Sequence, residues 1–530
     1  MARRRCQPKL VSFPILGTAT GASAGRVTAY FSKVISMKRN GRQLGFVLVI
    51  LFASSPVLLA QSRLPDVLRR GGRPSLEDPR RPAAPRSRTE ELRNQADLAY
   101  QQGNYEEVVE LTTQVIAAEP EQPFAWYQRA SARIELGKLG GDHELIREGI
   151  SDAREALRLG GKTYVFLYVP YLYGLTALSE IESRPQHADL AIQVVSPVLE
   201  RTDIAPNERG PLFYQRGLAH MAKGDFESAA ADFSVAIQLS RTLLAAYFGL
   251  AEAYTASGDL TRARSTYNRA VEMFPDNPLA FNNRGTFLQQ QGEFGAAIED
   301  FSRAIELNPN FTTALTNRGF ARGNQQDYRG AEYDYVASLK LDTQQPLVYR
   351  LLGTNRLSYG AIQAALEAYS SALQLDPEYP EGYADRAFAR YFAGDTDGAI
   401  DDLNKALELD SGLTMLVPWK ALVLRAADKA DESKAAVQEL GQSGEQVDWP
   451  TQLARYLAGS INDEQLLKSA MIPEQVCDAH YFIAQRADFE GKEADAKKHY
   501  EECVKTGAFR IASYRGAQYA LGLFTKAAAK

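Results

Sequence analysis

Side chains that carry catalytic or metal chemistry are scarce in this chain. Its 530 residues include 3 Cys and 5 His. The sequence contains neither a Gly-rich phosphate loop of the Walker type nor a His-Glu-x-x-His metal motif. Because so few nucleophiles and ligands are available, we expect no catalytic residue, no metal, no cofactor and no small-molecule substrate. The sequence therefore predicts a protein that is not an enzyme.

A basic surface is also missing from most of the chain. Residues 1–88 hold 17 Lys and Arg against 3 Asp and Glu, a net charge of +14, while the whole chain carries −5. Residues 89–530 therefore carry −19. Since nucleic-acid binding requires a basic face, we expect no nucleic-acid partner. Basic peptides and proteins are compatible with this charge.

The N-terminal region reads as targeting and linking sequence. Residues 1–36 show no helical or strand period, which is typical of a disordered upstream extension. Residues 37–60 have a positive start and an apolar stretch from Leu44 to Ala60, as in a signal peptide cut after Ala60. Residues 61–88 are rich in Pro and Arg and read as a linker. We expect export to the periplasm or cell envelope, with an uncleaved membrane anchor as the alternative.

A repeat of 34 residues organises the centre of the chain, residues 210–411. One residue of each repeat marks the period, and it is Gly in five of the six repeats. These residues are Gly224, Gly258, Gly292, Gln326, Gly360 and Gly394. We number each repeat so that this residue is place 15. Six repeats without a slip indicate a stacked repeat architecture.

Each repeat reads as two amphipathic helices separated by the place-15 turn. In the third of the six repeats, the first helix contains a small residue, Gly285, at place 8. We expect a neighbouring backbone to approach the helix there. The second helix buries an Ala at place 20 and an aromatic residue or Leu at place 24, and Asn308-Pro309 ends it. This pattern resembles the tetratricopeptide repeat (TPR). The resemblance implies an all-α, right-handed superhelical solenoid of antiparallel helix pairs, with about ten units and a C-terminal capping helix.

Residues 89–209 contain less regular units of the same kind. Residues 89–121 keep the turn glycine, Gly103, in phase. The next unit has about seven extra residues within 138–148. Residues 162–201 read as a divergent third unit, and residues 202–209 as a connection.

Residues 412–530 contain degenerate units and a distinct C-terminal part. A helix led by Trp449-Pro450 precedes a TPR-like unit that begins near Cys477 and a terminal helix. This arrangement resembles the C-terminal part of the NlpI-type TPR lipoproteins. The resemblance implies an exported, homodimeric adaptor that presents peptidoglycan hydrolases to a processing protease. The present chain differs from that family in having more repeats and no cysteine after the apolar stretch.

Two places of the repeat vary together. Wherever place 7 is Arg, place 23 is Asp, and where place 7 is Leu250 or Leu352, place 23 is uncharged. Because an unpaired buried charge is costly, this pattern predicts structural ion pairs. The predicted pairs are Arg129 with Asp152, Arg216 with Asp232, Arg284 with Asp300, Arg318 with Asp334, and Arg386 with Asp402.

Two cysteines and two histidines are predicted to lie close together on one pair of helices. Cys477 and His480 are three apart on one predicted helix, and His499 and Cys503 are four apart on the next. Three interpretations are open: two separate packed thiols, a Cys477–Cys503 disulfide, or a metal site. Export favours oxidation.

A second stripe of the first helices is the predicted binding groove for a peptide or protein client. It combines amides, which donate and accept hydrogen bonds, with aromatic side chains. Its residues are Asn282, Thr286, Gln289, Gln290, Thr316, Phe320, Asn324, Arg350, Thr354, Phe388, Tyr391 and Phe392. The sequence thus predicts an exported TPR scaffold that presents a protease or peptidoglycan hydrolase. The alternative is a structural or assembly factor of an envelope complex.

Overall fold

The structure of the chain is a computed structural model that describes residues 87–441 and 448–522. Within these ranges the chain forms 25 α-helices and one short 3-10 helix, with no strand, which confirms the all-α prediction. None of these helices is long and apolar enough to cross a membrane. The predicted extension, signal peptide and linker up to residue 86 lie outside the described ranges.

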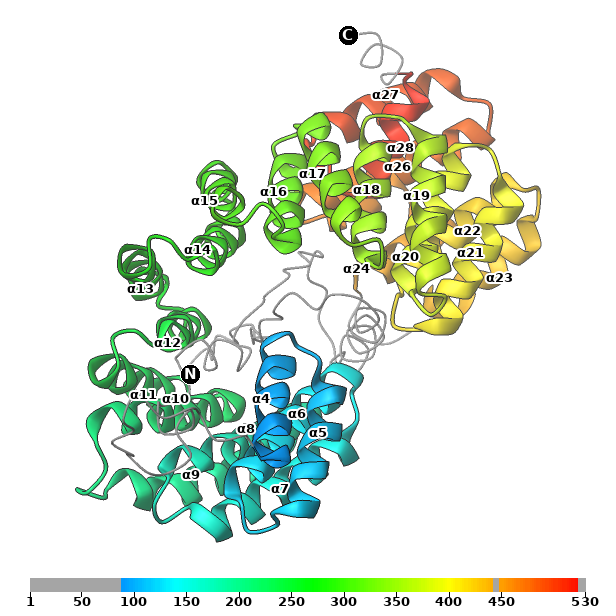
Figure 1. Ribbon diagram of the computed structural model, residues 1–530. Helices are drawn as coiled ribbons and strands as arrows, with labels where there is room; N and C mark the ends of the chain where they lie inside the picture. Colours follow the sequence, from blue (N-terminus) through cyan, green and yellow to red (C-terminus); the bar gives the residue numbers. More distant parts are fainter. Residues whose placement is uncertain (1–86, 442–447, 523–530) are drawn as a thin grey trace, which may run out of the picture. The chain divides into compact units, whose positions relative to one another are not determined.

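The described residues divide into two compact bodies, an N-terminal body (87–311) and a C-terminal body (312–522), shown in Figure 1. The helices of the N-terminal body are α4 (Arg88–Gln101), α5 (Tyr105–Ala118), α6 (Pro123–Gly140), α7 (His143–Gly160), η1 (Val165–Leu167), α8 (Tyr168–Ile181), α9 (Pro185–Leu199), α10 (Pro206–Lys223), α11 (Phe226–Leu239), α12 (Leu244–Ser257), α13 (Leu260–Met273), α14 (Pro278–Gln290) and α15 (Phe294–Leu307). Successive helices pack against each other as antiparallel pairs. In addition, α6 contacts α8, α8 contacts α10, and α10 contacts α12. The first helices of the pairs therefore form one layer, which we call the first-helix face.

The C-terminal body continues the same pairs. Its helices are α16 (Thr312–Asn324), α17 (Tyr328–Leu341), α18 (Pro346–Ser358), α19 (Ile362–Leu375), α20 (Pro380–Phe392), α21 (Thr396–Leu409), α22 (Leu416–Ala426), α23 (Ala430–Gly441), α24 (Trp449–Leu457), α25 (Asp463–Ser469), α26 (Pro473–Phe489), α27 (Glu493–Lys505) and α28 (Ala512–Ala520). The six regular repeats are the pairs from α10/α11 to α20/α21. The division between the bodies falls in the middle of them.

The turn residue at place 15 adopts left-handed backbone geometry in all six repeats. Gly292 has a φ of 78°, and its counterparts at the other four glycines lie between 76° and 88°. Gln326 holds the same conformation, with a φ of 63°. A left-handed residue reverses the chain after a helix and lets its own and the next N–H reach back to the last carbonyls. The glycines therefore recur at a fixed period because the backbone of each turn requires a residue with a positive φ.

The small residue at place 8 makes room for an aromatic ring. A Cβ added to Gly285 would lie 2.8 Å from a ring carbon of Phe301, and one added to Gly319 would lie 2.9 Å from the ring of Tyr335. The close approach at Gly285 is thus made by the place-24 side chain of the paired helix. We expected a neighbouring backbone at this position.

The extra residues within 138–148 of the N-terminal body lie largely in helix, because α6 and α7 each run to 18 residues while most helices of the regular repeats have 13 or 14. The insertion is therefore absorbed as about one more turn on each helix. In the predicted connection 202–209, α10 begins at Pro206, where proline at the first helical position is favourable.

The C-terminal helices fold back onto the regular repeats of their own body. One buried cluster joins Tyr369 of α19 and Phe392 of α20 to Trp419, Tyr481 and Ala517, on α22, α26 and α28. The last helix, α28, contacts α20 as well as α26 and α27. The predicted capping helix is therefore a packed part of this core.

The left-handed turn generates a stability prediction. Gln326→Gly removes the steric cost of a side chain at positive φ, and we expect the free energy of unfolding to rise by about 0.5 kcal/mol after the entropic cost of glycine. The matched control is Gly292→Ala. No atom lies within 4 Å of its added Cβ, so the expected loss of about 1 kcal/mol reports the backbone alone. Thermal unfolding of the full chain measures both, and a loss of stability in Gln326→Gly would contradict this account.

Candidate functional site

The five predicted Arg–Asp pairs are all formed, and each joins the two helices of one pair. Arg284 donates from Nε and Nη2 to the two carboxylate oxygens of Asp300, at 2.8 and 2.7 Å. The side chain of Asp300 is 7% exposed and that of Arg284 is 25% exposed. The same bidentate geometry joins Arg129 to Asp152, Arg216 to Asp232, Arg318 to Asp334, and Arg386 to Asp402.

The arginine of the pair also reaches the preceding helix pair. Arg284 Nη1 donates to Asn268 on α13 at 3.2 Å, and Arg386 Nη1 donates to Ser370 on α19 at 3.3 Å. One guanidinium group therefore links three helices. This arrangement makes the pairs structural.

In some repeats a second arginine, at place 11, contacts the same aspartate, and we did not predict this contact from the sequence. Arg322 Nη1 lies 2.8 Å from Asp334, and Arg390 Nη1 lies 2.9 Å from Asp402. Asp300 has no such neighbour, because Leu288 occupies place 11 of its repeat. The signal was available as an arginine four positions after Arg318 and after Arg386, one helical turn further on.

The predicted groove residues of the N-terminal body lie on α14 and are mostly buried. Asn282 is 1% exposed, Thr286 4% and Gln289 4%, and Gln290 is half-buried. Thr286 Oγ1 donates to the carbonyl of Asn282 at 2.9 Å. Gln289 Oε1 is buried and has no hydrogen-bond partner among the described residues.

In the C-terminal body, three predicted groove aromatics contact later helices of the same body, α22, α26 and α28. Phe388 packs on Trp419 with ring centroids 4.8 Å apart, and Phe392 stacks on Tyr519 of α28 at 6.4 Å. The hydroxyl of Tyr391 donates to Gln485 of α26. The fold-back of α26 and α28 therefore covers this part of the predicted groove, a long-range contact that the repeat pattern does not encode.

The remaining predicted residues of this body are bonded within it. Arg350 donates to Asp385 at 2.8 Å and to the hydroxyl of Tyr379 at 2.6 Å. Thr354 shares a hydrogen bond with the hydroxyl of Tyr369, Thr316 with Ser338, and Asn324 donates to the carbonyl of Phe320. Phe320 and Asn324 are half-buried.

Three glutamates on the first helices of the N-terminal body form a group that the sequence reasoning did not identify. We call Glu135 of α6, Glu180 of α8 and Glu252 of α12 the carboxylate cluster. Burial raises the pKa of Glu135 to about 7, against the opposing effects of Lys138 and Tyr173. Burial, together with the charge of Glu180, raises the pKa of Glu252 to about 8. Both side chains are therefore costly to ionise in the free protein.

Tyrosines lie among these carboxylates. Glu135 and Glu180 both disfavour ionisation of Tyr173, and Glu135 does the same to Tyr100. Lys138 donates to the hydroxyl of Tyr173 at 2.7 Å, and its ammonium lies 4.4 Å from the centre of that ring. The cluster thus combines negative charge with aromatic surface.

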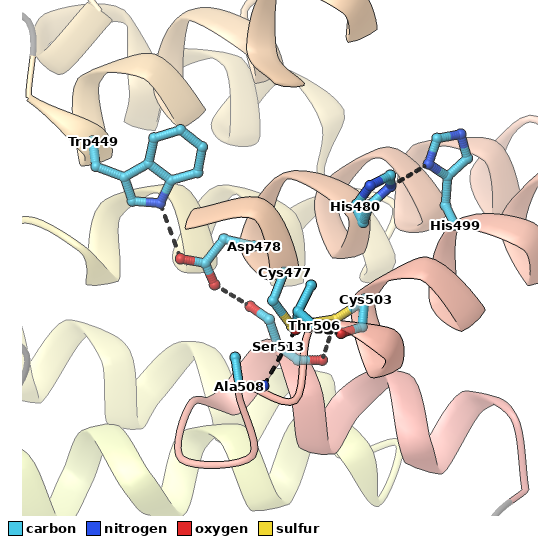
Figure 2. Close-up of a disulfide and its surroundings, with 9 residues drawn as sticks. All are labelled: Trp449, Cys477, Asp478, His480, His499, Cys503, Thr506, Ala508 and Ser513. Atoms are coloured by element: carbon cyan, nitrogen blue, oxygen red, sulfur yellow. Dashed lines mark hydrogen bonds between the residues drawn. A yellow bond between two sulfur atoms is a disulfide. The ribbon is translucent and has the colours of Figure 1, made fainter. Parts of the chain in front are cut away.

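The C-terminal cysteines are joined in a disulfide between α26 and α27 (Figure 2). The Cα atoms of Cys477 and Cys503 are 4.2 Å apart, and both side chains are fully buried. His480 and His499 face each other nearby, with their Nδ1 atoms 2.9 Å apart. Of the three interpretations, the structure contains the disulfide. No group of three or more metal-type ligands is found among the described residues.

A buried carboxylate next to the disulfide ties three C-terminal helices together. Asp478 of α26 accepts a hydrogen bond from the indole N–H of Trp449 on α24 at 3.0 Å and another from the hydroxyl of Ser513 on α28 (Figure 2). Burial raises the pKa of Asp478 to about 6. These bonds explain why the sequence places Trp449 at the head of its helix.

Comparison with known proteins identifies the repeats. One family model described as tetratricopeptide repeat matches residues 278–311, and another with the same description matches residues 214–278. No curated protein sequence matches the chain. The resemblance of the C-terminal part to the NlpI-type lipoproteins therefore stays a prediction.

Several solved structures are similar to the chain. Yeast Tom70 is 14% identical, with 71% of this chain and 90% of that chain covered and a TM-score of 0.39. A tetratricopeptide repeat protein from Parabacteroides merdae is 19% identical, with 48% and 98% covered and a TM-score of 0.38. YrrB, described as a TPR protein with an unusual peptide-binding site, is 17% identical, with 38% and 99% covered and a TM-score of 0.31.

The ion pairs generate a graded stability prediction. Asp300→Ala leaves Arg284 without its partner and should cost about 3 kcal/mol. The double variant Arg284→Leu/Asp300→Ala imitates the uncharged repeats and should lose at least about 1 kcal/mol less. Asp334→Ala strands both Arg318 and Arg322 and should cost more than Asp300→Ala. Melting temperatures of the four proteins check this order, and equal losses in the single and double variants would refute it.

The disulfide generates a redox prediction. Its cysteines are separated by 26 residues, so the bond should stabilise the fold by about 3 kcal/mol through the unfolded state. Dithiothreitol should therefore lower the melting temperature of the wild-type chain. The matched control is Cys477→Ser/Cys503→Ser, whose melting temperature should not respond to the reductant. A wild-type protein that is equally insensitive would show that the thiols are separate.

Proposed function

We propose that this chain, which is a tetratricopeptide repeat protein and hence a protein-interaction scaffold, works as an exported adaptor of the cell envelope. In this role it has no catalytic activity of its own. It binds a client protein on the first-helix face of the N-terminal body and presents a protease or a peptidoglycan hydrolase. The runner-up is a structural or assembly factor of an envelope complex.

The observation that carries the adaptor role is a difference between the two bodies. In the C-terminal body, Trp419 of α22, Gln485 of α26 and Tyr519 of α28 contact Phe388, Tyr391 and Phe392, respectively, so these side chains already have a partner. Of the four buried side-chain oxygens without a hydrogen-bond partner within the described residues, three lie on first helices of the N-terminal body (Glu135 Oε1, Gln215 Oε1 and Gln289 Oε1) and one, Asn355 Oδ1, lies in the C-terminal body. Because a buried polar atom without a partner is costly, this face is the better candidate for a ligand.

Two features support export. Residues 37–60 have the charge and apolar pattern of a signal peptide. In addition, Cys477 and Cys503 are paired, and structural disulfides persist in oxidising compartments. The client is named from the resemblance of the C-terminal part to the NlpI-type adaptors, which also implies a homodimer.

The test is a cross-linked capture experiment with the full chain in the native envelope fraction, analysed by mass spectrometry. We expect a protease or peptidoglycan hydrolase to be captured, and to be lost with Asn282→Ala/Gln289→Ala/Gln290→Ala. The control exchanges exposed second-helix residues, Glu227→Ala/Glu299→Ala/Tyr333→Ala, and should retain the client. Because Asn282 and Gln289 are buried, melting temperatures are compared, and Gln290→Ala, at a half-buried position, is also tested alone.

The outcomes separate the two functions. Recovery of the chain alone, or of secretion and assembly subunits, would replace the adaptor by the structural factor. Capture of the same client by both triple variants would move the binding surface away from the first helices.

A further inference from the structure

We propose that the carboxylate cluster of the N-terminal body, formed by Glu135, Glu180 and Glu252, binds a segment of a partner protein through its Arg or Lys side chains. This inference rests on the adaptor function proposed above and adds the chemistry of the bound segment. It concerns the N-terminal body by itself.

The buried aspartates of these repeats are matched by cations. Asp152 contacts both Arg129 and Arg133, and Asp232, Asp300, Asp334 and Asp402 each accept two hydrogen bonds from an arginine. Glu252 has no hydrogen bond or ion pair within the described residues. Glu252 is half-buried and differs from these aspartates in having no cation beside it in the described part of the chain.

Two buried side-chain oxygens near the cluster lack a hydrogen-bond partner in the part of the chain that the structure describes. Glu135 is 6% exposed, and its Oε1 has no hydrogen-bond partner within the described residues. Gln215 is 1% exposed, and its Oε1 is likewise unpartnered. It lies on α10, the helix that contacts both α8 and α12, which carry the other two glutamates. These atoms are all acceptors, so the missing group is a donor. Guanidinium and ammonium groups carry five and three N–H donors and no acceptor.

One cation of the chain itself already occupies a place beside these carboxylates. Lys138 already lies over the ring of Tyr173 with its ammonium 4.4 Å from the ring centre. Tyr100 and Tyr173 both lie near enough to Glu135 for its charge to oppose their ionisation. A second cation would gain from the same combination of carboxylate and aromatic ring.

Titration of the cluster gives the binding a pH dependence. The groups that face Glu135 are Lys138, Tyr173 and Tyr100, and those that face Glu252 are Glu180 and Tyr267. With pKa values of about 7 and about 8, Glu135 and Glu252 are protonated at low pH and ionised above both values. An arginine side chain stays charged throughout this range. Affinity for it should therefore rise with pH between about 6 and about 9 as the carboxylates lose their protons.

The test measures binding of a fluorescein-labelled peptide of alternating Arg and Ser to the full chain by fluorescence anisotropy. The matched probe carries citrulline, the neutral isostere of arginine, in place of each Arg. We expect the Arg peptide to bind about tenfold more tightly than the citrulline peptide at about pH 9, and the difference to shrink at about pH 6.

Protein variants locate the binding. Glu135→Gln and Glu252→Gln keep shape and remove charge, and each should weaken binding of the Arg peptide by about tenfold. Glu299→Gln, an exposed glutamate of α15, controls for the overall negative charge and should leave affinity unchanged. A higher melting temperature of Glu252→Gln at about pH 9 would show that the variant is folded and that an uncompensated charge has been removed.

Three outcomes would overturn the proposal. Equal affinity for both peptides would remove the role of charge, and equal weakening by Glu299→Gln would make the attraction non-specific. The chain's own seven arginines between residues 63 and 86 offer the same chemistry. If the Arg peptide binds only after these are replaced by Ser, the chain's own segment is the occupant, and binding of a partner segment is refuted.

The two proposals fail separately. If the envelope experiment captures a client while Arg and citrulline peptides bind alike, the adaptor function stands and recognition of a basic segment falls. If the Arg peptide binds through Glu135 and Glu252 while no client is captured, the proposed binding of a basic segment is supported and the proposed envelope adaptor function is refuted.

Discussion

The stack of helix pairs depends on one buried guanidinium–carboxylate contact that recurs through the chain. In each instance the arginine of a first helix holds the aspartate of its partner helix with two hydrogen bonds, and in several it also reaches the preceding pair. Such a contact adds little net stability over an apolar pair, because both charges must leave water. Its value is directional, since a bidentate pair tolerates only a narrow range of angles between the helices that it joins. In the repeats with Leu250 and Leu352 both charges are gone together, as this reasoning requires.

Much of the fold could be predicted from the sequence because a solenoid is built from local contacts. The period of the turn residue, the ion pairs and the small residue at place 8 all concern side chains within one repeat or its neighbour. Periodicity does not encode contacts between distant parts of one body. The fold-back of α28 onto α20 joins residues more than a hundred positions apart, so the cover over Phe388, Tyr391 and Phe392 was not foreseen.

The candidate site was harder to predict than the fold for a related reason. Place numbering identifies which first-helix positions share a face, but it does not say which of them are buried or left unpartnered. The predicted amides on α14 are indeed on first helices, yet they are almost fully buried. Glu135 and Glu180 lie in units that depart from the 34-residue period, and Glu252 lies in a repeat without an Arg–Asp pair. Their proximity became visible only from the three-dimensional arrangement of α6, α8 and α12.

The contrast between the arginine-paired aspartates and Glu252, which has no such arginine, separates stability from function in this chain. A buried carboxylate with an arginine costs the fold little, whereas one that is held protonated destabilises the fold whenever it must ionise. Replacing Glu252 by a neutral residue would remove that cost, so packing alone gives no reason for the charge. A ligand that brings its own cation gives such a reason, because it supplies the missing donor only in the bound state. A basic segment stabilises the ionised carboxylates on binding, whereas a neutral segment does not. Binding is therefore selective for the basic segment.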